Sequence, residues 1–332
     1  MSTLNASVSS DPDVVRVGDS LSKVVGGSRV GHEVPFGAFT TFRVGGGAEW
    51  LAESRGFDET VRLLRVARQL GLPVTRLGGG SNVLVSDCGV RGLVIRIRHG
   101  VIECLDRGVV RVDAGVSLNR LVRWTIARGL AGVEAWAGTP GTVGGAIYGN
   151  AHFQGKLISE QIFRVGVADV NGNTYEVDVS EMGFGYNESR LHQTGETVLW
   201  ADFSVMPSAS TALRTVALAS LAYRKRTQPL STLNAGCVFR NPNPTRENLP
   251  AGVPASAGAL IERAGLKGVA VGCARISEVH GNFIEGYGRV TAQEIRSLIE
   301  LCRKRVRERF GITLQEEIVY LGEFSAEPPD RA

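Results

Sequence analysis

The most informative part of this sequence is a pair of glycine-rich stretches, Leu77-Gly-Gly-Gly-Ser-Asn-Val-Leu-Val-Ser-Asp87 and Ala137-Gly-Thr-Pro-Gly-Thr-Val-Gly-Gly-Ala-Ile-Tyr-Gly-Asn150. Three consecutive glycines let the backbone approach a ligand closely, and successive free N–H groups can hold a phosphate. The first stretch is neither a Rossmann fingerprint nor a P-loop, because it lacks both G-x-G-x-x-G and a Gly-Lys-Ser/Thr ending. Taken alone, such a glycine-rich stretch is more often just a turn, and the alternative for the second stretch is a tight, buried hairpin loop.

The overall composition is that of a soluble globular protein. The chain has 332 residues, of which 43% are hydrophobic and 21% charged, and its length fits two or three domains. A net charge of +4 is too small to indicate nucleic-acid binding. The longest uncharged run, residues 135–155, is too rich in glycine for a membrane helix, so we expect no membrane insertion. The five cysteines lack CxxC spacing, which argues against disulfides and metal sites and predicts a reducing, cytoplasmic environment.

Patterning divides the chain into five segments. Residues 1–33 are polar and are expected to form a flexible extension, and residues 325–332 a tail. Residues 34–100 and 101–214 each mix helices and strands, and residues 215–324 form a third, α+β unit. Helices are predicted at 57–70, 118–130, 211–226, 260–264 and 291–310, and strands at 73–76, 83–85, 93–97, 109–112 and 312–321.

Taken together, the two glycine stretches resemble the FAD-binding domain of the vanillyl-alcohol-oxidase (PCMH) type, in which the pyrophosphate lies on the first and the isoalloxazine on the second. Elsewhere in the chain stand the motifs Thr41-Phe-Arg-Val-Gly-Gly46, Asn234-Ala-Gly-Cys-Val-Phe-Arg-Asn-Pro242, Ala257-Gly-Ala-Leu-Ile-Glu-Arg-Ala-Gly-Leu-Lys-Gly268, Ser277-Glu-Val-His-Gly-Asn-Phe-Ile284 and Leu314-Gln-Glu-Glu-Ile318. With these motifs, residues 34–324 resemble the UDP-N-acetylenolpyruvoylglucosamine reductase family, in its shorter type II form.

The resemblance implies an α+β fold, with a two-part FAD-binding domain (34–100 and 101–214) and a C-terminal substrate domain. It implies non-covalent FAD and NADPH as co-substrate, and a reaction that reduces UDP-N-acetylglucosamine enolpyruvate to UDP-N-acetylmuramate. The residues expected at the cofactor are Arg43, Gly78, Gly79, Gly80, Ser81, Asn82, Thr139, Pro140, Gly144, Gly145 and Asn150. No metal is expected.

Two catalytic positions follow from the family motifs. The family's proton donor is a Ser in a Gly-Ser-x-Phe motif, and Cys237 stands at that position. A thiol, with a reference pKa of about 8.5, is mostly protonated at neutral pH and can donate a proton in the same way. The alternative is an inert buried cysteine. Glu317 matches the family's C-terminal catalytic glutamate or is a solvated carboxylate at a strand edge, and its neighbour Glu316 should face the opposite way.

A third catalytic position departs from the family. Where the family has Tyr-Arg-x-Ser, this chain has Tyr186-Asn-Glu-Ser-Arg190, so Asn187 occupies the place of the arginine that stabilises the enolate. If the segment is helical, Asn187 and Arg190 share a face, and Arg190 could supply the missing guanidinium. The alternative is that Arg190 is a surface residue. The substrate's diphosphate and nucleotide are expected to contact Arg224, Arg226, Gln228, Arg240 and Asn241.

Two other functions remain open at this stage. The departures at Asn187 and Cys237 allow a catalytically impaired paralogue that binds FAD or a UDP-sugar. A flavin oxidase of the wider fold, acting on another substrate, is the second alternative. The match of the C-terminal third to the reductase's substrate domain argues against the oxidase.

Overall fold

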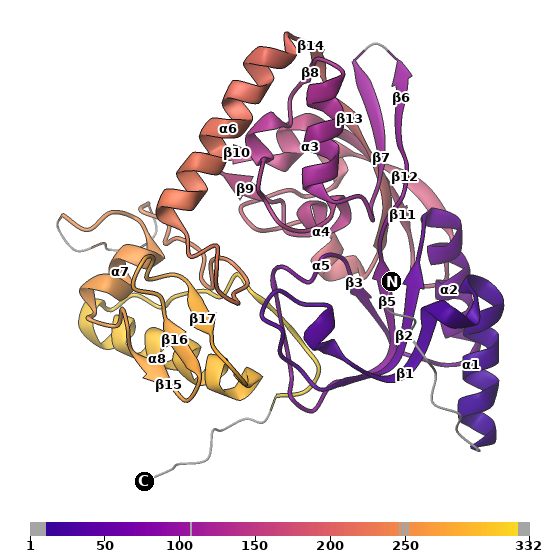
Figure 1. Ribbon diagram of the computed structural model, residues 1–332, viewed down its shortest axis with the longest axis horizontal. Coiled ribbons are helices and arrows are strands. Elements are labelled where there is room, and N and C mark those ends of the chain that lie inside the picture. Colours follow the sequence, from indigo (N-terminus) through magenta and orange to yellow (C-terminus); the bar gives the residue numbers. More distant parts are fainter. Residues whose placement is uncertain (1–10, 107, 246, 248, 250–251, 325–332) are drawn as a thin grey trace. The chain divides into compact units, whose positions relative to one another are not determined.

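The computed structural model describes residues 11–106, 108–245, 247, 249 and 252–324 (Figure 1). The described chain divides into two compact units. Unit 1 comprises residues 11–34, 48–79 and 91–223, and unit 2 comprises residues 35–47, 80–90 and those from 224 onward. Each unit thus draws on three stretches of chain, whereas the sequence predicts consecutive segments, and those segment boundaries stay a prediction. Residues 1–10 of the predicted extension and the tail at 325–332 lie outside the described residues.

The first layer of unit 1 is a four-stranded sheet with the order β1-β2-β5-β3, packed against helices α1 and α2. Helix α1 (Pro12–Val25) corrects the expectation of a flexible extension. Asp11 caps its first turn, and Val17, Leu21 and Val25 form an apolar stripe at four-residue spacing that is buried in the core. The other elements are α2 (Phe57–Gln69), β1 (Val30–Pro35), β2 (Gly47–Ser54), β3 (Val74–Leu77) and β5 (Val90–Ile97).

The second layer of unit 1 is an antiparallel sheet with the order β12-β11-β13-β7-β6. Helices α3 (Leu118–Ala127) and α4 (Val143–Tyr148) bury apolar side chains in the same core as this sheet. The strands are β6 (Ile102–Asp106), β7 (Val109–Asp113), β11 (Ile162–Ala168), β12 (Thr174–Asp178) and β13 (Thr197–Ser204). The shorter elements are β8 (Leu130–Ala131), β9 (His152–Phe153), β10 (Lys156–Leu157), α5 (Leu191–Thr194) and β14 (Met206–Pro207).

Unit 2 is built around helix α8 (Ala292–Phe310), whose apolar face packs over a three-stranded sheet. Thr291 and Glu294 form the predicted capping box, and Gly311 ends the helix at a φ of 70°. Apart from that sheet, β4 (Val83–Val85) and β18 (Val319–Leu321) pair with each other as parallel strands. Helix α6 (Ser210–Thr227) enters unit 2 at its last turn. The remaining elements are α7 (Ala257–Arg263), β15 (Ala270–Val271), β16 (Ala274–Ile276) and β17 (Ile284–Gly286).

The α+β prediction is confirmed, and most predicted helices agree with the observed ones to within a few residues. The predicted strand at 312–321 is wrong for most of its length, because only Val319–Leu321 pairs as a strand. Before that strand, Glu316 forms only an isolated antiparallel β-bridge with Phe239, whose hydrogen bonds are described below. Among the described residues, no helix combines the length and the apolar character needed to span a bilayer.

Candidate functional site

The start of the first glycine stretch, residues 77–79, lies against the second stretch within unit 1. A Cβ atom at Gly79 would lie 2.7 Å from the Cα atom of Gly141, and a Cβ at Gly78 would overlap the hydroxyl of Thr142. Thr142 also caps α4, where its Oγ1 accepts a hydrogen bond from the Gly145 amide (3.4 Å). Only residues without a side chain permit this close approach. The predicted cofactor residues Gly78 and Gly79 are therefore brought next to the second stretch.

Asn119 of α3 holds the start of the second stretch, and the sequence analysis did not identify it. Its Oδ1 accepts from the Gly138 amide (2.8 Å), and its Nδ2 donates to the Thr139 carbonyl (3.1 Å). These bonds fix the loop that contains the predicted cofactor residues Thr139 and Pro140, of which Pro140 is exposed. The sequence signal that could have identified Asn119 was its short polar side chain within the predicted helix 118–130.

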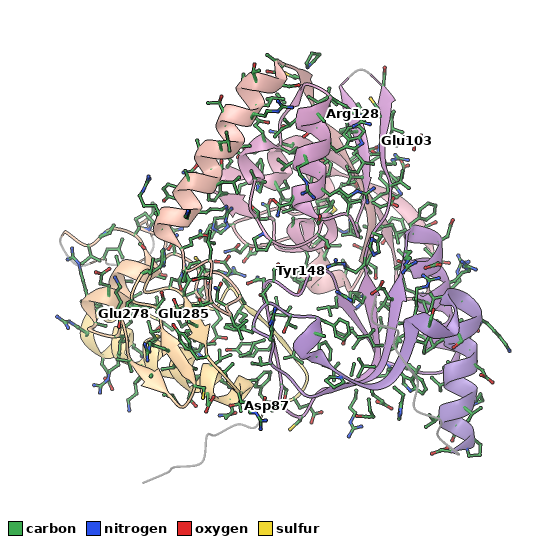
Figure 2. All side chains as sticks on the ribbon, in the orientation of Figure 1. Asp87, Glu103, Arg128, Tyr148, Glu278 and Glu285 are labelled. Carbon is green, nitrogen blue, oxygen red and sulfur yellow. The ribbon has the colours of Figure 1, made fainter. Side chains whose placement is uncertain are left out.

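In unit 2, the part of the first stretch that runs from Gly80 to Asp87 is anchored to two other segments. The carbonyl of Gly80 accepts from the Thr41 amide (3.0 Å), which brings the segment containing Arg43 beside the glycines. Arg43 itself has a φ of 57°, in the left-handed region. At the far end, the Asp87 carboxylate accepts from the amides of Ala292 and Gln293 at the start of α8, each at 3.0 Å (Figure 2).

The Tyr186–Asn187 turn is attached to the end of the second stretch in unit 1. The side chain of Asn150 donates to the Gly185 carbonyl (2.8 Å), and the Ser189 hydroxyl donates to the carbonyl of Tyr148 (2.7 Å; Tyr148 is labelled in Figure 2). Asn187 has a φ of 56° and is 6% exposed. Three predicted site residues, Asn150, Tyr186 and Asn187, are thus grouped together.

His152 is a further member of this group that the sequence analysis did not select. Its Nε2 lies 3.4 Å from the Tyr186 hydroxyl, and its ring also hydrogen-bonds the Asn187 side chain. Burial lowers the pKa of the His152 imidazole below its ordinary value, although the bond to Asn187 opposes this shift.

Arg190 is not on a helix with Asn187, and that premise of the sequence analysis is wrong. Residues 185–188 form a tight turn, because Gly185 and Glu188 pair across it. The Arg190 guanidinium makes two hydrogen bonds to Glu196, of 3.0 Å from Nε and 2.8 Å from Nη2. Burial disfavours ionisation of Glu196, but bonds from Tyr175, Thr194 and Arg190 keep the pKa of its carboxyl below the ordinary value. A role for Arg190 towards an enolate stays a prediction.

Cys237 and Glu317 are brought together in unit 2 by backbone hydrogen bonds. The Glu317 amide donates to the Val238 carbonyl (2.8 Å), and the Arg240 amide donates to the Gln315 carbonyl (2.8 Å). Asn82 joins the same group, because its side chain donates to the Glu317 carbonyl (3.1 Å). Glu316 instead forms an ion pair with Arg303 of α8 (3.2 Å), as expected for a side chain that faces away from Glu317.

The thiol of Cys237 stays protonated at neutral pH. Burial, with the Glu317 charge adding to it, raises the pKa of this thiol to about 12, against the opposing effects of Asn282 and Arg224. Arg224 is 6% exposed, and burial lowers its pKa to about 10, so it is a cation at neutral pH. This group can therefore hold a proton on sulfur beside a buried positive charge.

The predicted substrate residues differ in their exposure. Of the basic run at 224–226 only Arg224 is buried, and its Nη1 donates to the Gln228 side chain (3.3 Å). Arg226 and Asn241 are exposed, and Arg240 is half-buried. Asn241 accepts from the Ala257 amide at the start of α7 (3.1 Å).

Comparisons with known proteins agree with this arrangement. Residues 51–178 match the family model of an FAD binding domain, and residues 228–321 match that of the UDP-N-acetylenolpyruvoylglucosamine reductase C-terminal domain. A UDP-N-acetylenolpyruvoylglucosamine reductase from Synechococcus sp. (strain WH7803) is 40% identical over 297 residues, which cover 88% of this chain and 93% of the relative. The chain belongs to the UDP-N-acetylenolpyruvoylglucosamine reductase family.

Two further members of the reductase family give the same result. UDP-N-acetylenolpyruvoylglucosamine reductase 2 from Symbiobacterium thermophilum is 38% identical over 303 residues, which cover 91% of this chain and 95% of that relative. The crystal structure of the reductase from Thermus caldophilus superposes with a TM-score of 0.73 at 32% identity, covering 89% of this chain and 99% of that one. The predicted family and its FAD-binding fold are therefore confirmed.

Proposed function

We propose that this chain is an FAD-dependent reductase that converts UDP-N-acetylglucosamine enolpyruvate to UDP-N-acetylmuramate, with NADPH as reductant. The observation that supports the proposal is the hydrogen bond from the Glu317 amide to the carbonyl of Val238, the residue after Cys237, in a chain of this family.

The residues of the two glycine stretches fit FAD. The close approach of Gly79 to Gly141 packs the two stretches against each other, and glycine-rich backbone of this kind can present its N–H groups to a phosphate-bearing ligand. In unit 1 we assign FAD binding to Gly78, Gly79, Thr139, Pro140, Gly144, Gly145 and Asn150. The expected cofactor residues of unit 2, Arg43, Gly80, Ser81 and Asn82, stay predictions from the family resemblance. Bound FAD supplies the hydride that the terminal vinyl carbon of the substrate receives.

Cys237 is the proposed proton donor. The reduction leaves negative charge on the substrate's carboxylate end, and the α-carbon then needs a proton. The S–H bond of Cys237 breaks as the C–H bond forms, and the electron pair stays on sulfur until it regains a proton from solvent. The raised pKa keeps that proton on the sulfur at neutral pH until an acceptor as basic as an enolate carbon forms. Glu317 is proposed to orient the same end of the substrate.

In unit 1, Tyr186 and Asn187 are proposed to act at the enolate end of the substrate. Asn187 is buried and is held by the attached turn, so its amide is preorganised, although it lacks the charge of the family's arginine. Arg190 remains a candidate for that charge, but its bonds to Glu196 compete with such a role.

The diphosphate and nucleotide of the substrate are assigned to Arg226, Gln228, Arg240 and Asn241. Their cations and amides suit phosphate and carbonyl oxygens. Arg224, predicted from the sequence as a further substrate residue, is buried with its charge acting on Cys237 and is assigned to the thiol instead. The five cysteines are free thiols, in keeping with a proposed cytoplasmic location.

The test is analysis of the product. FAD-loaded protein, NADPH and UDP-N-acetylglucosamine enolpyruvate are incubated in deuterium oxide. We expect a product with two added hydrogens, of which one is solvent deuterium at the α-carbon. Unchanged substrate, with FAD bound and reducible, would instead favour the impaired paralogue.

A further inference from the structure

Asn282 lies in the loop between β16 and β17 and is only 2% exposed. Its backbone carbonyl accepts from the Val238 amide (2.9 Å), and its Oδ1 accepts from the Phe239 amide (2.9 Å). Its Nδ2 donates to the Phe239 carbonyl (2.7 Å). Three hydrogen bonds from one residue thus hold the two residues that follow Cys237.

The Asn282 side chain also acts on the Cys237 thiol, because hydrogen bonding from Asn282 lowers the pKa of that thiol against the effect of burial. The main-chain amide of Asn282 donates to Nδ1 of His280 (3.2 Å), and this bond also fixes the loop between β16 and β17. On the opposite side, the same segment is held by the bonds from Glu317 and to Gln315. Cys237 therefore stands at the start of a segment that is restrained from two directions.

We propose that Asn282 is the positioning residue of the proton-donating thiol, which it holds and orients through its side-chain amide. This inference rests on the proposed function, because it requires Cys237 to be the donor. An amide N–H directed at sulfur occupies a lone pair, so the S–H hydrogen is left to point elsewhere. The same N–H stabilises the negative charge that appears on sulfur when the proton leaves.

The charged groups around Cys237 cannot replace this bond. The Glu317 carboxylate raises the pKa of the thiol and so opposes proton release, whereas the Arg224 cation favours release. The main chain of Glu317 holds residue 238, but neither charged side chain takes part in the hydrogen bonds described for the backbone of residues 238 and 239. The Asn282 side chain bonds both backbone groups of Phe239 and also acts on the thiol.

The test is a double-mutant cycle on the two half-reactions. Asn282→Ala is made in the wild-type and in the Cys237→Ala backgrounds, and Ser277→Ala serves as control. Ser277 is a buried residue of the same loop whose hydroxyl accepts from Val279 (3.1 Å) and His280 (3.4 Å). FAD content, its reduction by NADPH and its anaerobic reoxidation by UDP-N-acetylglucosamine enolpyruvate are measured below the unfolding temperature. If Asn282→Ala does not fold, Asn282→Ser replaces it.

We expect Asn282→Ala to slow reoxidation by about 10- to 100-fold, as a small misplacement of a catalytic group does. FAD content, its reduction by NADPH and the Ser277→Ala control should stay near wild-type values. In the Cys237→Ala background, Asn282→Ala should have no further effect on reoxidation. An equal loss in both backgrounds, or an equal loss in both half-reactions, would overturn the inference. Failure of the wild type to be reoxidised would instead overturn the proposed function.

Discussion

The main-chain amide of Glu317 donates a 2.8 Å hydrogen bond to the carbonyl of Val238, the residue directly after Cys237. Two segments about eighty residues apart in the sequence are thereby joined at the positions that matter for proton transfer. The proposed proton transfer depends on this hydrogen bond, because it makes Cys237 and Glu317 neighbours.

Cys237→Ala should remove the proton donor and slow anaerobic flavin reoxidation by about 10²- to 10⁴-fold, the usual effect of losing a general acid. Cys237→Ser is the matched variant, since the family has serine there, and it should retain much of the rate. Reduction by NADPH should change in neither. Stopped-flow absorbance follows both steps, and full reoxidation in Cys237→Ala would remove the thiol from the mechanism.

Arg224 and Arg226 should behave differently although they are two residues apart. Arg224 is buried with its charge acting on Cys237, whereas Arg226 is exposed. Arg224→Gln should slow reoxidation at saturating substrate by about 10-fold or more. Arg226→Gln should weaken binding, with a smaller effect at high salt. Calorimetry with UDP-N-acetylglucosamine, which lacks the enolpyruvyl group, measures binding alone. It therefore distinguishes an arginine that binds the substrate from one that acts on the reoxidation step. Strong loss of its binding in Arg224→Gln would place Arg224 at the diphosphate instead.

Arg190→Ala should reduce stability more than activity. It leaves the buried Glu196 without its two guanidinium bonds, and we expect a loss of about 1–3 kcal/mol in the free energy of unfolding. Adding Glu196→Gln should recover part of that loss. Urea unfolding measures the stability. A large fall in the reoxidation rate with stability intact would show that Arg190 acts on the substrate.

Gly79→Ala should weaken FAD binding, because the new Cβ would lie 2.7 Å from Gly141 and would push the two stretches apart. Overpacking of about 1–3 kcal/mol corresponds to a loss of roughly 10-fold or more in affinity. Gly149→Ala is the control, since its Cβ meets nothing closer than 3.9 Å and its φ is −93°. Flavin absorbance of the purified proteins reports the difference. Equal FAD content in both variants would contradict the assignment of Gly79 to FAD binding.

The free energy of unfolding should fall at alkaline pH, and Cys302→Ala should make this fall smaller. Burial raises the pKa of the Cys302 thiol from near 9.0 to about 12. The folded chain therefore holds a proton that the unfolded chain releases. The stabilisation is complete below pH 9 and is lost as pH rises towards 12, by at most about 1.4 kcal/mol per pH unit. Urea unfolding from neutral to alkaline pH should show a shallower fall for the variant, and parallel curves would contradict this.

Features set by neighbouring residues were predictable from the sequence. Helix α8 follows from the capping box at Thr291 and the stop at Gly311, both of which act within one helical turn. The glycine stretches were identified because their lack of side chains is itself the signal. Helix α1 was missed although Val17, Leu21 and Val25 recur at helical spacing, because the surrounding stretch 1–33 is rich in Ser, Gly and Asp.

Contacts between distant segments were not predictable. Nothing near Arg190 in the sequence shows that Glu196 binds it, and the left-handed Asn187 turns the chain before a helix can form. The attachment of residues 315–317 to residues 238–240 replaces an expected strand, and hydrogen bonding over such a separation leaves no local pattern. The same is true of Asn282, whose bonds reach back to Phe239.

The most direct measurement is an anaerobic stopped-flow trace of the FAD-loaded protein, first reduced with NADPH and then mixed with UDP-N-acetylglucosamine enolpyruvate. We predict rapid return of the oxidised flavin absorbance and a rate that depends on Cys237. A flavin that NADPH reduces but this substrate leaves reduced would contradict the account.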